Sequence, residues 1–191
     1  MTMSKIVVSE FVSLDGVMDD PGGAEGSKHG GWTFQFSSGE QEQWKAEELL
    51  RADALLLGRR TYQGFAAAWP TMPGTGAYGE RMNSLPKYVV STTLSDMTWN
   101  ATLIKGDLAD ELSRLKQGEG RDLLVFGSVQ LVHMLHALGL IDEYRLMVFP
   151  VVLGSGKRLF PEGDEKAALQ LVESKAFASG VVVLTYQPSR E

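Results

Sequence analysis

The sequence predicts an α/β fold built on a mainly parallel sheet. Short apolar runs alternate with segments of helical spacing over most of the chain, and the last part contains strands with no helix between them. Such alternation is typical of parallel sheets covered by helices on both faces, and consecutive strands favour antiparallel pairing at one edge. With 191 residues, 43% of them hydrophobic, the chain can bury one full core, so we expect a single domain over residues 1–191.

A strand, a long loop and a helix are predicted first. Residues 5–13 are rich in Ile, Val and Phe and predict a buried strand that ends at Asp15-Gly16. Residues 19–39 are too polar and too rich in glycine for a regular element, and long loops of this kind in compact domains are usually functional. Ser38 to Gln41 has the spacing of a capping box and predicts a helix that runs to about Arg51.

The remaining elements follow from the same two periodicities. Residues 69–85 are predicted to form a loop, and Gly74 to Gly79 within it matches the dinucleotide fingerprint but follows prolines instead of a strand, so we assign it no cofactor. The predicted strands are 53–57, 87–91, 102–104, 122–126 and 144–152, with a terminal hairpin of 169–175 and 181–187. The predicted helices are 60–68, one from Asp107 to Gly118, and one that follows Gly127 and ends at Gly139.

Charge and composition exclude several classes of function. A net charge of −6 argues against nucleic acid and anionic membranes as partners. The absence of cysteine excludes disulfides, thiolate metal sites and cysteine nucleophiles, and it fits a cytoplasmic protein whose redox chemistry comes from a cofactor. No apolar stretch has the length of a membrane span. His133 and His136 share a helix face without a third ligand nearby, so we expect no metal site and place both at the helix surface.

Three strand ends carry residues suited to an anion. Gly58-Arg59-Arg60-Thr61 combines a glycine, guanidinium groups and a helix start, the features that phosphate binding requires. Gly127-Ser128 has the same strand-to-helix form without arginines, and Ser91-Thr92-Thr93 places three hydroxyls at another strand end. Taken singly, each also fits an ordinary polar turn. Because the carboxyl ends of parallel strands meet at one edge of a sheet, together they suggest one nucleotide site.

Five segments, taken together and in order, resemble the dihydrofolate reductase superfamily, and within it the branch that includes the reductase domain of bacterial riboflavin synthesis. They are Ser13–Gly16, Leu56–Tyr62, Lys87–Ser91, Val125–Ser128 and Pro150–Gly156. The resemblance covers nearly the whole chain. It implies a dihydrofolate reductase-like three-layer αβα fold, a mainly parallel mixed sheet with antiparallel C-terminal strands, and NADPH as cofactor. The deaminase domain that often accompanies the riboflavin enzymes has a cysteine signature that this chain lacks, so we expect a stand-alone reductase.

The resemblance also implies site residues. Arg59 would lie near the adenosine-ribose phosphate, and the turn after Gly127 would hold the pyrophosphate. The cofactor-binding residues that it implies are Gly16, Gly58, Arg59, Arg60, Thr61, Ser91, Thr92, Thr93, Gly127, Ser128, Val129 and Gln130. Because the family joins two adjacent glycines after its fifth strand by a cis bond, we expect a cis peptide between Gly127 and Ser128.

The activity implied by the resemblance is hydride transfer from NADPH to a carbonyl, Schiff base or C=N bond of a small heterocyclic substrate, pterin-like or pyrimidine-like. Asp15, Glu40 or water would supply the proton. The loop of residues 19–39, with Trp32 and Phe34, would cover the substrate and exclude water. Two alternatives stay open, a nucleotide-binding or sensor protein without catalysis and an enzyme that uses flavin in the same cleft. A homodimer is expected from the resemblance.

Overall fold

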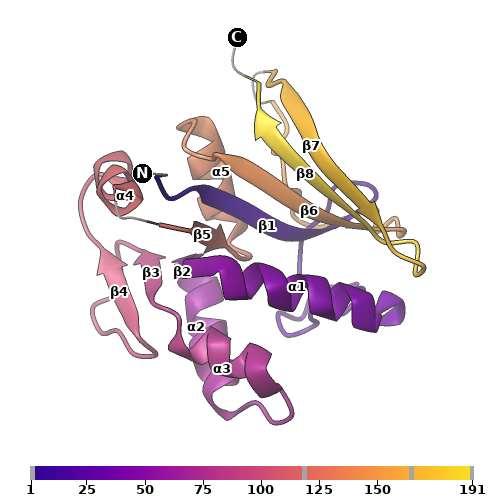
Figure 1. Ribbon diagram of the computed structural model, residues 1–191, viewed down its shortest axis with the longest axis horizontal. Coiled ribbons are helices and arrows are strands. Elements are labelled where there is room, and N and C mark those ends of the chain that lie inside the picture. The colour runs from indigo at the N-terminus through magenta and orange to yellow at the C-terminus, as the bar shows by residue number, and fades with distance from the viewer. Residues whose placement is uncertain (1–2, 118–119, 164–165, 190–191) are drawn as a thin grey trace.

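A computed structural model of the chain describes residues 3–117, 120–163 and 166–189. One mixed sheet of eight strands forms the middle of the molecule, with helices on both of its faces (Figure 1). The predicted α/β class and three-layer arrangement are therefore confirmed. No helix in these described ranges is long and apolar enough to cross a membrane.

The strand order is β4-β3-β2-β5-β1-β6-β8-β7, and every neighbouring pair from β4 to β6 is parallel. The strands are β1 (Ile6–Ser13), β2 (Ala52–Gly58), β3 (Lys87–Val90), β4 (Ala101–Ile104), β5 (Asp122–Val125), β6 (Glu143–Phe149), β7 (Leu169–Ala176) and β8 (Val182–Pro188). The helices are α1 (Gly39–Arg51), α2 (Arg59–Ala68), α3 (Gly76–Ser84), α4 (Leu108–Lys116) and α5 (Val129–Ala137), with short 3-10 turns η1 (Phe34–Phe36) and η2 (Trp69–Thr71). The predicted end of α4 at Gly118 lies outside the described residues.

Alternating side chains of the central strands build a separate core on each face of the sheet. Leu56 and Val125 point into the core beneath α4 and α5, whereas their neighbours Leu55 and Leu57 pack against α1, α2 and α3. Strands that are apolar at nearly every position are what a sheet buried on both faces requires. This burial fixes the register of the sheet, and it aligns the carboxyl ends of its parallel strands.

The C-terminal hairpin extends the sheet in the antiparallel sense, as predicted, because β8 pairs antiparallel with both β6 and β7. A third cluster, which contains Trp32, Phe149 and Phe177, packs the loop of residues 19–38 against these strands. The Trp32 indole is 5% exposed and donates to the backbone carbonyl of Asp19 at 2.9 Å, whereas Phe34 is 68% exposed.

The prediction of a loop over residues 69–85 was wrong, because α3 lies within it. The prolines precede this helix and do not interrupt it. A Cβ added to Gly79 would lie 1.9 Å from the Thr75 hydroxyl oxygen, so the backbone packs closely there. Met82 and Leu85 are each 1% exposed, and their burial against the sheet stabilises a segment of poor helical propensity.

Candidate cofactor site

A groove of about 620 Å³ opens at the carboxyl ends of β2, β3 and β4, beside the start of α5. Its polar wall contains two cationic side chains, Arg59 and Lys105, and the hydroxyl groups of the turn after β3. Its apolar wall contains Ile104, Leu108 and Met134. Of the predicted cofactor-binding residues, those that line it are Gly58, Arg59, Ser91, Thr92, Thr93 and Gln130. The structure therefore brings all three predicted strand ends to one edge.

Hydrogen bonds shape the polar wall of the groove. The Ser91 hydroxyl accepts the backbone N–H groups of Thr93 and Leu94, both at 3.2 Å, and so holds the turn after β3. The Arg59 guanidinium donates to the Thr93 hydroxyl at 3.3 Å, and this hydrogen bond joins the end of β2 to the end of β3. Because both side chains are exposed, the guanidinium is available to an anion placed between β2 and β3.

Two helix starts next to the groove have no side-chain cap. Gly58 precedes α2 and Ser128 precedes α5, and neither position caps its helix with a side chain. The first N–H groups of each helix are consequently available to an anion, which the helix dipole also favours.

Ser128 joins these two helix starts through its side chain. Its hydroxyl oxygen accepts the Gly58 backbone N–H at 2.7 Å and donates to the Thr61 hydroxyl at 2.9 Å. A Cβ added to Gly127 would lie 3.0 Å from the Thr61 hydroxyl oxygen, and a Cβ added to Gly58 would lie 3.0 Å from the Ser128 side chain. A side chain at either position would crowd the contact, so the two glycines favour this close approach of the turns.

The expected cis peptide between Gly127 and Ser128 was wrong, because the bond is trans. The chain turns here through two consecutive residues in the left-handed region, Gly127 at φ +60° and Ser128 at φ +64°. A serine in this region is uncommon. The two hydrogen bonds of its hydroxyl supply a local reason for the conformation, since they hold the side chain between β2 and α2.

The other predicted cofactor-binding residues do not line the groove. Thr61, Gly127 and Ser128 lie directly behind it, in the contact just described. Arg60 is exposed on α2, and Val129 packs into the core beneath α5. Gly16 lies on the loop after β1, where its φ of +84° forms a turn and its carbonyl accepts the Leu159 N–H at 2.9 Å.

The structure gives Asp15 a role in holding that loop. Its carboxylate accepts the Ser13 hydroxyl at 2.6 Å and the backbone N–H groups of Leu153 and Gly154 at 3.1 and 2.8 Å. These hydrogen bonds, the Ser13 contact first, lower the pKa of Asp15 to about 2. A carboxylate held ionised in this way is a poor proton donor. Glu40, the other predicted acid, is exposed in the first turn of α1.

The two histidines lie half-buried on the surface of α5, and both contact other protein groups. The His133 ring lies 2.9 Å from the Arg158 carbonyl oxygen, and His136 lies 2.8 Å from the Tyr144 hydroxyl. Within the described ranges, no group of three His, Asp or Glu side chains could hold a metal ion.

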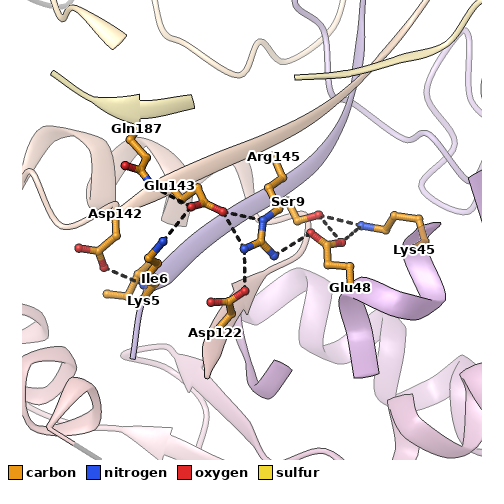
Figure 2. Close-up of polar contacts among 10 residues, drawn as sticks. All are labelled: Lys5, Ile6, Ser9, Lys45, Glu48, Asp122, Asp142, Glu143, Arg145 and Gln187. Atoms are coloured by element: carbon orange, nitrogen blue, oxygen red, sulfur yellow. Dashed lines mark hydrogen bonds and ion pairs between the residues drawn. The ribbon is translucent and has the colours of Figure 1, made fainter. Parts of the chain in front are cut away.

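A buried ionic network lies beneath α1 (Figure 2). The Arg145 guanidinium contacts Asp122 at 2.7 Å, Glu143 at 2.6 Å and Glu48 at 3.5 Å. Glu48 also accepts the Lys45 ammonium at 2.7 Å and the Ser9 hydroxyl at 2.8 Å. The network joins α1 to three strands and neutralises Glu48 within the protein.

Sequence reasoning missed Lys105 and Gly106, which line the groove. They directly follow β4, so the reasoning applied to the other strand ends would have found them. It also missed Glu10, whose side chain is buried in β1 and whose Oε1 atom has no hydrogen-bond partner among the described residues. An acidic residue within a predicted strand gives no sign of the direction in which it points.

Comparison with known proteins agrees with this fold. A family model described as the RibD C-terminal domain matches residues 4–183. The chain is 29% identical to the uncharacterized protein YyaP of Bacillus subtilis over 185 residues, which is 95% of this chain and 94% of YyaP. A putative riboflavin biosynthesis protein from Shewanella sp. PV-4 superimposes with a TM-score of 0.77, at 22% identity, over 97% of this chain and 99% of that one. Dihydrofolate reductase from Enterococcus faecalis complexed with NADP(H) and RAB-propyl superimposes with a TM-score of 0.64, at 13% identity, over 97% of this chain and 97% of that one.

Proposed function

Because the chain belongs to the RibD C-terminal domain family, we propose that it is an NADPH-dependent reductase that transfers a hydride to a small heterocyclic substrate, pterin-like or pyrimidine-like. The observation that carries the proposal is the groove at the carboxyl ends of β2, β3 and β4, with its two cationic side chains and its row of hydroxyl groups. Dinucleotides bind outside the carboxyl ends of strands in open α/β sheets, where helix starts meet their phosphates.

The residues of the groove fit the phosphates of NADPH. Arg59 and Lys105 face the groove from neighbouring sides, and a guanidinium can share two hydrogen bonds with one phosphate. We assign Arg59, with Ser91 and Thr92, to the phosphate on the adenosine ribose. We assign the N–H groups at the start of α5, near Gln130, to the pyrophosphate. The apolar wall offers a surface for the adenine ring.

The bound cofactor would supply the hydride, and the protein would orient it and exclude water. The loop of residues 19–38 supports the second task, because Trp32 anchors it in a buried aromatic cluster with Phe149 while Phe34 stays exposed. A loop fixed at one aromatic residue and exposed at the next can pack against a substrate without leaving its anchor.

Titration of the purified protein with NADPH and with NADH, followed by nicotinamide fluorescence, tests the cofactor assignment. The Arg59→Ala variant should bind NADPH at least about tenfold more weakly and NADH nearly as well as wild type, because a charge-assisted bond to a phosphate contributes roughly 1.5–3 kcal/mol. Arg51→Ala is the matched control, since Arg51 is exposed at the far end of α1. Equal losses for both nucleotides would contradict the assigned role of Arg59.

Oxidation of NADPH by candidate acceptors tests the reaction. We expect turnover with 7,8-dihydropterin or with an aminopyrimidine Schiff base, each of which carries a reducible C=N bond. Binding of NADPH without oxidation by either compound would favour the alternative of a nucleotide-binding or sensor protein without catalysis. Absence of NADPH binding would contradict both.

A further inference from the structure

The strand order marks a second place at the carboxyl edge of the sheet, between β1 and β5, which lies outside the groove described above. The chain leaves β1 through α1 toward β2, on one side, and leaves the neighbouring strand β5 through α5 toward β6, on the other side. These two connections cross in opposite directions, so α1 and α5 cover opposite faces of the sheet. Where adjacent parallel strands send their connections to opposite faces, a crevice forms outside their carboxyl ends, and ligands bind there. The backbone pairing of the strands is consistent with a crevice at this point. The pairing of β1 with β5 ends at Val8 and Val125, whereas the pairing of β1 with β6 continues to Ser13.

Glu10 lies just beyond the last residue pair between β1 and β5. Its side chain is 6% exposed, and its Oε1 atom is buried with no hydrogen-bond partner in the part of the chain that the structure describes. A buried polar atom left unpaired costs roughly 1–3 kcal/mol, so such atoms are rare in native proteins. An unpaired carboxyl oxygen at a ligand crevice is accounted for if a ligand completes its hydrogen bonding.

The surroundings of Glu10 favour its neutral, protonated form. Burial raises the pKa of Glu10 well above its usual value, against the opposing effects of the Gly127 backbone N–H and of Lys45. The Lys45 ammonium contacts Ser9 and Glu48, each at 2.7 Å, so it is already paired with another carboxylate (Figure 2). Glu48 in turn raises the pKa of Glu10 further. The site therefore favours the protonated carboxyl group of Glu10 more than water does.

We propose that Glu10 is the proton donor of the reaction, and that it contacts the substrate in the crevice between β1 and β5. This inference rests on the proposed function. In reduction of a C=N bond, the hydride from the cofactor forms a C–H bond at carbon, and the nitrogen takes the proton from the Glu10 carboxyl group. The resulting carboxylate regains a proton from water after product leaves. Asp15 is unsuited to this step because it is held ionised, and Glu40 because it is exposed.

Infrared difference spectra test the protonation of Glu10 without any turnover. Wild type at neutral pH should show the C=O stretching band of a protonated carboxyl group that is absent from Glu10→Gln, and the band should shift when 7,8-dihydropterin is added to the complex with NADP+. The matched control, Glu42→Gln, removes an exposed carboxyl group of α1 and should leave the band in place. A wild-type spectrum without this band, or a band that does not respond to the pterin, would overturn the proposal.

Single-turnover oxidation of NADPH by 7,8-dihydropterin tests the proton transfer. Glu10→Gln keeps the size of the side chain, so NADPH affinity should stay within about threefold of wild type, while the rate at pH 7 falls about 100-fold or more, the usual contribution of a general acid. Glu10→Asp should retain part of the rate. A rate for Glu10→Gln close to that of wild type, or a comparable loss for Glu40→Gln, would overturn the assignment. If wild type binds NADPH but no acceptor oxidises it, the proposed function fails, and this inference fails with it.

Discussion

Replacement of Ser128 tests whether its hydroxyl group holds the two helix starts behind the groove together. In Ser128→Ala the Gly58 N–H loses its acceptor at 2.7 Å and the Thr61 hydroxyl loses its donor at 2.9 Å. Because both partners are only half-buried, water compensates in part. We therefore take about 1 kcal/mol for each bond and expect the free energy of unfolding to fall by about 2 kcal/mol.

Ser128→Gly separates the hydrogen bonds from the backbone conformation. It loses the same two bonds, but glycine adopts φ near the observed +64° without the steric penalty that other residues meet. That penalty is about 1 kcal/mol, so Ser128→Gly should be more stable than Ser128→Ala by about this amount and less stable than wild type.

Urea unfolding at equilibrium measures these differences, and an unchanged m-value would show that the same two states are compared. Ser95→Ala is the matched control, because Ser95 is exposed and its hydroxyl contacts the neighbouring Asp96. If Ser128→Ala is as stable as wild type, or if Ser128→Gly is the less stable of the two variants, the account of this turn is refuted.

Three further predictions concern buried charges and pH. Burial lowers the pKa of Lys87 from 10.5 to about 8, so between these pH values the unfolded chain binds a proton that the native protein does not. As pH rises through this window, the unfolding free energy of wild type should therefore increase by up to about 3 kcal/mol relative to that of Lys87→Met. A difference that stays constant with pH would contradict this. Asp15 has its pKa lowered from 3.8 to about 2, so the advantage of wild type over Asp15→Asn should be constant above pH 4 and disappear as pH falls toward 2; acid titration of both proteins tests this. Arg145→Met removes a cation that contacts three carboxylates; Glu48 keeps Lys45 and Glu143 keeps Lys5, whereas Asp122 loses its ion pair. We expect a cost of about 3 kcal/mol in urea unfolding, and a loss under about 1 kcal/mol would mean that the network contributes little.

Much of the fold follows from local patterns in the sequence. The apolar runs of the parallel strands, the cap at Ser38 and the glycines where β2 and β5 turn into helices each have a physical reason that can be seen in the residues themselves. The three strand ends could be assigned to one edge because parallel strands all point the same way. The helix α3 could not be predicted, because its stability comes from burial of Met82 and Leu85 against the sheet.

The candidate site was predictable where it depends on the order of strand ends, and not where it depends on the direction of side chains. Arg59 and Ser91 were found for the first reason and line the groove. The conformation of Ser128 depends on contacts with Gly58 and Thr61, which are distant in the sequence. Glu10 was missed because the sequence of an apolar strand does not show that one of its carboxyl groups is buried without a hydrogen-bond partner among the described residues.

The most direct test of the cofactor site is the change in backbone amide NMR signals of the 15N-labelled protein during titration with NADPH. We predict that the largest shifts fall on the residues around the groove, namely Gly58, Arg59, Thr92, Thr93, Gly106 and Gln130. Residues of the edge strand β7 should not respond. Shifts confined to other parts of the chain, or no shifts at saturating NADPH, would contradict the assignment of this groove as the cofactor site.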